Sequence, residues 1–137
     1  MKRPVVTVLS AAGIVCGMFL AMTSLNAAPE KTKVLRHVVL LKFKSDATKE
    51  QVQAIVDALG ELPMKIDAIA GYEHGLNNSK EGRSKGFTHC FTITFKDEAG
   101  RDKYLPHPAH NEFVQKALPL IEDVLVVDYF ADVEKAN

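Results

Sequence analysis

The chain has 137 residues, and its 17 Lys and Arg side chains balance 17 Asp and Glu side chains. This length predicts a single domain. A formal net charge of zero excludes the basic surface with which nucleic-acid-binding proteins neutralise phosphates, so we expect no nucleic-acid partner. Two cysteines are too few for a small scaffold held together by disulfides.

The N-terminus has the composition of a secretory signal peptide. Lys2 and Arg3 precede an uncharged run over 5–22, which a short polar stretch and small residues follow. A basic start, an apolar middle and a small-residue end are typical of export signals. Cleavage before Ala28 fits better than cleavage before Pro29, because signal peptidase disfavours a proline directly after the cut. We therefore expect export, either periplasmic or secreted; the alternative is an uncleaved anchor, since the apolar run reaches the length of a bilayer span.

Apolar and β-branched runs predict strands in the rest of the chain, and apolar residues at helical spacing predict amphipathic helices. In chain order, we expect a strand over 35–43, a helix over 49–62 ended by Pro63, a weak strand over 72–76, a strand over 87–95, helices over 97–105 and 111–120, and a strand over 124–130. Thr48 and Gln51 have capping-box spacing, and Asp97 is the expected N-cap of the second helix. The order β-α-β-β-α-β predicts an α+β fold, the ferredoxin-like split unit.

The predicted sheet carries helices on one face only. By strand alternation the other face holds Val38, Leu40, Cys90 and Thr92, and it is too apolar to be left in water. Two such sheets packed face to face would bury it, so we expect a homodimer.

The domain organisation follows from these elements. We expect a signal peptide over 1–27, a polar lead-in over 28–34, one domain over 35–131 and a C-terminal tail over 132–137. No membrane contact is expected beyond the signal segment, because no basic amphipathic helix follows it.

Two histidines are expected inside the fold. Strand alternation puts His37 and His89 on the face that the helices cover. Because the first and third strands are neighbours in this topology, the two imidazoles are expected side by side, where they would form a polar pocket. The alternative is that each is a core histidine with its hydrogen bonds satisfied.

The segment 104–110 and the last strand add further polar groups. If a helix begins near Pro108, His107 lies at its N-cap and His110 in its first turn. A helix N-terminus favours the neutral imidazole, which can accept a proton. Asp128 interrupts an apolar strand, and a histidine on the covering helix is its expected partner. The alternative is a solvated charge near the end of the strand.

A metal or cofactor is not expected. His107 and His110 are three residues apart, and neutral imidazole suits Zn, Cu or Ni. However, a structural zinc site needs four ligands, and strand alternation sends Cys90 to the opposite face. The sequence also lacks an obvious flavin or haem signature.

Four stretches of the chain, in order, resemble one known family. They are Leu35-Arg36-His37-Val38-Val39, Gly86-Phe87-Thr88-His89, Tyr104 with His107-Pro108-Ala109-His110, and Val127-Asp128-Tyr129. The segment 35–131 is similar to the stress-response A/B barrel (Dabb) family. This resemblance implies a dimeric α+β barrel.

The resemblance implies less about chemistry, because most members of the family have no assigned reaction. One plant member closes a linear polyketide by aldol condensation, and its working tyrosine and histidine match Tyr104 and His110. Its strand aspartate matches Asp128, and two further pocket histidines match His37 and His89.

Two functions are therefore expected as alternatives. The first is an exported dimeric protein that binds a small molecule, or acts in the stress response, without catalysis. The second is a cyclase or lyase in which His110, oriented by Asp128, removes a proton α to a carbonyl while Tyr104 donates a hydrogen bond to the oxygen. In either case, the candidate substrate-binding residues are His37, His89 and His107.

Overall fold

The structure, a computed structural model, describes residues 31–134. The expectations for the leader over 1–27 and its cleavage lie outside these residues. The elements are β1 (Lys31–Phe43), α1 (Lys49–Gly60), α2 (Leu62–Lys65), β2 (Ile69–Leu76), β3 (His89–Phe95), α3 (Glu98–Tyr104), α4 (Pro108–Ala117), a 3-10 turn (Leu118–Leu120) and β4 (Ile121–Glu134). The predicted β-α-β-β-α-β order is confirmed, with each helical crossover divided into two helices.

The helix ends depend on local capping. The Thr48 hydroxyl accepts from the Gln51 N–H at 3.2 Å, and the Gln51 side chain accepts from the Thr48 N–H at 2.8 Å, which confirms the capping box. The Asp97 side chain accepts from the Gly100 N–H at 2.9 Å and caps the N-terminus of α3. Each such cap contributes roughly 1 kcal/mol.

Among the helix boundaries that differ from those predicted, two involve prolines. Pro63 does not end the first helix; α1 already ends at Gly60, and Pro63 lies in the first turn of α2. The second difference is in α4, which begins at Pro108 because His107 caps it, three residues before the predicted start. A proline suits a first turn, where its missing N–H has no helical partner to lose.

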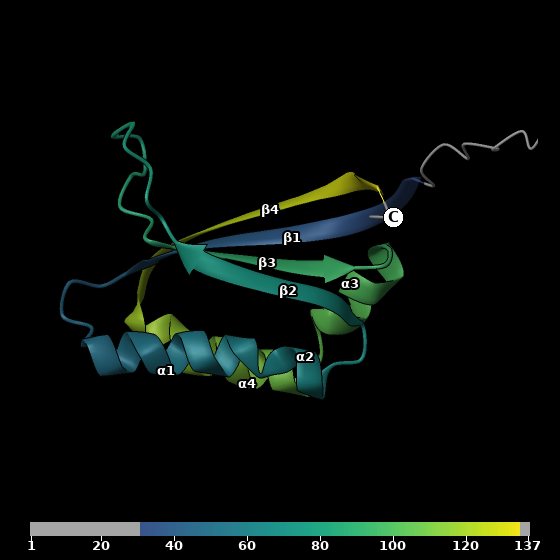
Figure 1. The fold of residues 1–137 in the computed structure, drawn as a ribbon. Helices are drawn as coiled ribbons and strands as arrows, with labels where there is room; N and C mark the ends of the chain where they lie inside the picture. The colour runs from purple at the N-terminus through teal and green to yellow at the C-terminus, as the bar shows by residue number, and fades with distance from the viewer. Residues whose placement is uncertain (1–30, 135–137) are drawn as a thin grey trace, which may run out of the picture.

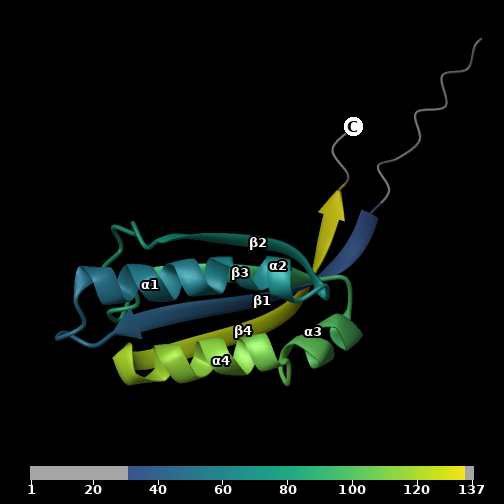
Figure 2. The ribbon, with the colours of Figure 1, turned by 90° about the horizontal axis from the view of Figure 1, so that it is seen from below.

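The sheet has the order β2-β3-β1-β4, and all neighbouring strands are antiparallel. The helices cover one face, with α1 over the β2–β3 side and α4 along β4 (Figures 1 and 2). Strands β1 and β4 are longer than predicted, because their pairing continues to Lys31 opposite Glu134. Residues 31–34 and 132–134, expected in the lead-in and the tail, therefore belong to the sheet.

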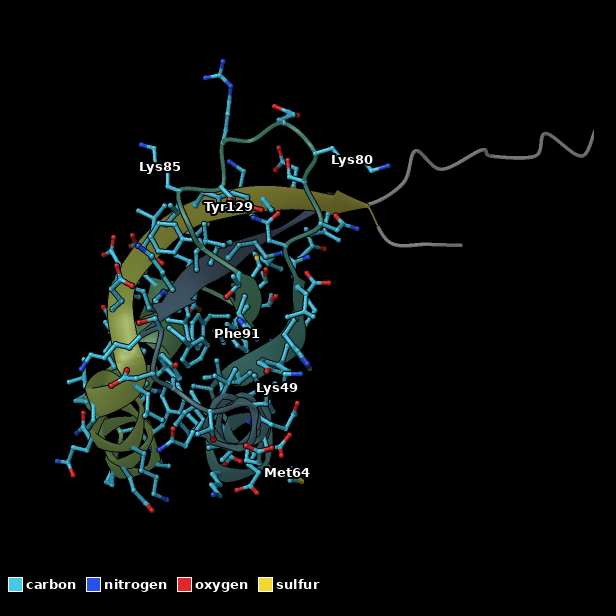
Figure 3. The ribbon with its side chains drawn as sticks, turned by 90° about the vertical axis from the view of Figure 1, so that its left-hand side faces the viewer. Lys49, Met64, Lys80, Lys85, Phe91 and Tyr129 are labelled. Carbon is cyan, nitrogen blue, oxygen red and sulfur yellow. The ribbon has the colours of Figure 1, made fainter. Side chains whose placement is uncertain are left out.

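The core lies between the sheet and the helices. Its buried side chains come from both layers and are Leu35, Leu41, Val56, Leu59, Leu62, Ile66, Phe91, Ile93, Phe95 and Tyr104. Figure 3 shows Phe91 in this layer, below the sheet and above the helices. The alternation predicted for β3 is confirmed, since Phe91, Ile93 and Phe95 are all fully buried.

The opposite face of the sheet has no helix over it and is apolar. Leu125, Val127 and Tyr129 face this side with Leu40, Val38 and Arg36, their partners in β1. The exposed fraction of Val127 is 46% within the chain, and its two neighbours on this face are similarly exposed. We call this surface, with Val38, Leu40 and Cys90, the open face. The loop after β2 rises on the same side, away from the helices (Figures 1 and 3).

Removing the ring at the centre of the core is expected to destabilise the protein. Phe91→Ala should lower the free energy of unfolding by about 3–5 kcal/mol, because the fully buried ring leaves a cavity behind. Urea denaturation at one fixed protein concentration measures the change. Met64→Ala is the control, since Met64 is 81% exposed and its loss should cost less than about 0.5 kcal/mol. Equal losses in the two variants would contradict this core.

Candidate functional site

A cavity of about 350 Å³ lies on the helix-covered face, between α4 and β4. This volume is at the lower end of the range for small-molecule sites. The residues that line the cavity are mostly apolar: Val39, Leu41, Leu59, Leu105, Phe113, Val114, Ala117, Leu118, Ile121, Val124 and Val126. Four further lining residues carry the polar groups: His37, Tyr104, His110 and Asp128. Val124 and Val126 are about half exposed, at 47% and 48%, so the cavity opens along β4.

The joint between α3 and α4 brings Tyr104 and His110 together. Tyr104 is the last residue of α3, and its carbonyl oxygen accepts from the His107 N–H at 3.0 Å. His110 follows in the first turn of α4, and the two ring centroids are 4.2 Å apart. Burial raises the pKa of Tyr104, and the nearby Tyr72 adds to the shift, so the phenol keeps its proton at neutral pH. Tyr104 is thus a hydrogen-bond donor beside a histidine.

The tautomer of His110 is fixed by its hydrogen bond to a backbone carbonyl. Its Nδ1 lies 2.9 Å from the carbonyl oxygen of Leu105. A carbonyl oxygen only accepts, so Nδ1 carries the proton and Nε2 is left unprotonated in the neutral ring. Burial lowers the pKa of His110; the Leu105 carbonyl opposes this shift, and the repulsion that a protonated His37 or His107 would exert adds to it. At neutral pH, His110 is therefore a neutral imidazole with a free acceptor nitrogen.

Asp128 holds His37 rather than His110. The register of β1 and β4 puts the two residues directly opposite each other, and Asp128 Oδ1 lies 2.6 Å from His37 Nδ1. The other carboxylate oxygen accepts from Arg101 Nη1 at 3.2 Å. The expectation that a histidine of the covering helix would be the partner of Asp128 is wrong, because His110 uses a backbone carbonyl instead.

His89 and His107 do not line the cavity. His89 pairs with Leu41, four residues along β1 from His37, so the two imidazoles share a face but are not side by side as predicted. The His89 ring packs edge-on against Phe43, with centroids 5.0 Å apart, and burial followed by the charge of His74 lowers its pKa. His107 acts as the N-cap of α4, accepting from the Ala109 N–H at 3.2 Å.

Arg101 is the polar neighbour of the site that the sequence reading missed. It lies on α3, three residues before Tyr104, and so faces the same side of that helix. This spacing was the available signal, but only the folded chain brings Arg101 to Asp128. Within residues 31–134, no three His, Cys, Asp or Glu side chains are grouped so that they could hold a metal ion. None of the helices described in this range is long and apolar enough to cross a bilayer.

The fold and the cavity define an α+β protein of ferredoxin-like topology with a small-molecule-sized pocket beside its last strand. The chain belongs to the Dabb family: the family model for the "Stress responsive A/B Barrel Domain" matches residues 35–131. The stress-response A/B barrel domain-containing protein HS1 of Arabidopsis thaliana is 32% identical over 95 residues, which cover 69% of this chain and 87% of that protein. Olivetolic acid cyclase of Cannabis sativa is 27% identical over 95 residues, covering 69% and 94%.

Solved structures agree on the fold. The hydroxynitrile lyase from Passiflora edulis has a TM-score of 0.67 and 25% identity, covering 80% of this chain and 99% of that chain. A ferredoxin-like protein from Jannaschia sp. CCS1, described as dimeric, has a TM-score of 0.63 and 25% identity, covering 70% and 97%. The resemblance found in the sequence and the predicted fold class are confirmed.

Acidification is expected to destabilise the protein. The pKa values of His110 and His89 are lowered in the folded chain, so the unfolded chain binds more protons as the pH falls below about 6.5. The free energy of unfolding should therefore drop between about pH 7.5 and pH 5.5, by less than about 1.4 kcal/mol per pH unit for each histidine. Urea titrations across this range measure the slope. His110→Gln and His89→Gln should each reduce the slope of the free energy of unfolding against pH. An unchanged slope in both variants would contradict the lowered pKa values of these histidines.

Proposed function

We propose that this Dabb protein binds a small, mostly apolar molecule that carries a polar group, in the cavity between α4 and β4. The single observation behind the proposal is the cavity itself. It has a volume of about 350 Å³ and a mostly apolar lining, and Tyr104, His110 and His37 supply polar groups to it. Apolar pockets with a few well-placed polar groups are the usual form of small-molecule sites. An action in the stress response is compatible with this binding and with the name of the family.

The proposal includes a homodimer formed through the open face. Val127, Leu125 and Tyr129 expose a continuous apolar surface that one chain alone leaves in water. Two copies packed face to face would remove it and would form the expected α+β barrel. The Jannaschia structure, which is described as dimeric, supports the formation of a dimer.

Export is the remaining part of the proposal, and it rests on the sequence alone. The basic, apolar and small-residue regions of 1–27 support a signal peptide whose removal would leave Ala28 as the first residue.

A second candidate function is catalysis of the lyase or cyclase type. It is favoured by the contact of Tyr104 with the neutral His110, and by the names of two relatives, a cyclase and a hydroxynitrile lyase. In this reading His110 Nε2 takes a proton from the substrate, while the Tyr104 hydroxyl donates to the oxygen on which charge develops. The Leu105 carbonyl, rather than the Asp128 expected from the sequence, orients the His110 ring.

Native mass spectrometry of the protein purified from the extracytoplasmic fraction tests the binding proposal. The expected result is a dimer whose subunits begin at Ala28 and which carries a small adduct that denaturation releases. Val114→Trp should abolish the adduct and preserve the dimer, because Val114 lines the cavity from α4. Gln115→Trp is the control, since Gln115 is exposed on the same helix and outside the cavity. A ligand-free monomer would overturn both parts.

Cyanohydrin cleavage tests catalysis. With mandelonitrile, the expected reaction breaks the carbon–carbon bond to cyanide, transfers the hydroxyl proton to His110 and forms benzaldehyde, which absorbance detects. His110→Gln should lower the rate at least about 100-fold, as expected for loss of a general base. Gln115→Ala on the same helix should leave it unchanged. A wild-type rate no higher than that of buffer, or an equal rate in His110→Gln, would contradict lyase-type catalysis.

A further inference from the structure

We infer that Arg101 is a positioning residue that acts through Asp128 to fix His37 as a hydrogen-bond acceptor in the cavity, so that the ligand must carry a hydrogen-bond donor such as a phenolic hydroxyl. This inference rests on the proposed binding function and names the chemistry that the site selects.

The chain of contacts runs from α3 through β4 to β1. One oxygen of Asp128 lies 2.6 Å from His37 Nδ1, and the other accepts from Arg101 Nη1 at 3.2 Å. Each carboxylate oxygen therefore has its own partner, and the carboxylate cannot rotate without losing one of them. The Asp128 side chain holds a single orientation between the two groups.

The guanidinium group is itself fixed from two sides. Nε and Nη2 of Arg101 donate to Asp102 Oδ1 at 3.2 and 3.1 Å, while Nη1 donates to Asp128. A planar fork held by two carboxylates has little freedom to turn, which a lysine at this position could not reproduce. Arg101 thus presents one N–H to Asp128 in a defined direction.

The consequence is a fixed tautomer of His37. A carboxylate only accepts, so His37 Nδ1 carries the proton and donates it to Asp128. In the neutral ring, Nε2 is then the unprotonated nitrogen. The His37 side chain is 7% exposed and lines the cavity, so a ligand bound there can donate a hydrogen bond to this nitrogen.

His110 strengthens the preference for a donor. Its Nδ1 proton is bound to the Leu105 carbonyl, so His110 Nε2 is also unprotonated. A bound ligand that fills the cavity and cannot donate would cut both acceptor nitrogens off from water without replacing the hydrogen bonds that water makes to them. A molecule of the same shape without a donor would bind more weakly, because it would desolvate both nitrogens without compensation.

The tautomer can be read directly. Nitrogen-15 NMR of the labelled protein should show His37 with a protonated Nδ1 and an unprotonated Nε2. In Arg101→Met, the His37 ring should be a mixture of the two tautomers. In Arg101→Lys, the tautomer protonated at Nδ1 should be restored only partly. Lys103→Met is the matched control, because it removes an exposed cation from the same helix and should change nothing. An unchanged His37 tautomer in Arg101→Met overturns the inference.

Calorimetric binding of 4-nitrophenol and nitrobenzene tests the selectivity. Wild-type protein should bind 4-nitrophenol more tightly than nitrobenzene. Arg101→Met should lower the affinity for 4-nitrophenol by about threefold to tenfold and leave the affinity for nitrobenzene unchanged. Equal losses for both probes would mean that Arg101 only supports the wall of the cavity, which overturns the inference. Failure of both probes to bind the wild type would instead refute the proposed binding site, and the NMR result would still decide the role of Arg101.

Discussion

Strands β1 and β4 pair without a register shift from Lys31 to Lys42, and this register determines which polar groups meet in the helix-covered cavity. It puts Asp128 directly opposite His37 and places Val124 and Val126 on the cavity side of the last strand. Because side chains alternate between faces, a slip of one residue would send the aspartate to the open face and leave His37 without its partner. The chemistry of the site therefore depends on a backbone ladder as much as on the residues themselves.

The second constraint is the short joint between α3 and α4. Pro106 and Pro108 flank His107, whose backbone N–H closes onto the Tyr104 carbonyl while its ring caps the next helix. This geometry places the phenol at the end of one helix and His110 in the first turn of the other, with their rings in contact. Histidine at position 107 is thus a structural part of the joint, which accounts for its absence from the cavity wall.

The sequence predicted much of the fold, because local rules govern it. The caps at Thr48 and Asp97, and the apolar face of β3 formed by Phe91, Ile93 and Phe95, could be predicted from near neighbours in the chain. The site was less accessible. Strand alternation gave the correct face for His89 but not its position along the strand, which follows from the register with Leu41. Likewise, no local pattern could show that Arg101 reaches Asp128, since the two residues are 27 apart in the chain and only the folded structure brings the Arg101 side chain of α3 to β4.

The alternation of β4 has one more consequence. Val124 and Val126 face the cavity, whereas Leu125 and Val127 on the same strand face the open side. In a dimer formed through the open face, each ligand would contact one face of β4, and the other face of the same strand would lie in the subunit interface. Any influence of ligand on subunit affinity must then be matched by an equal influence of association on ligand affinity, as thermodynamic linkage requires. Cooperativity between the two pockets would need no mobile domain, only a shift of this shared strand.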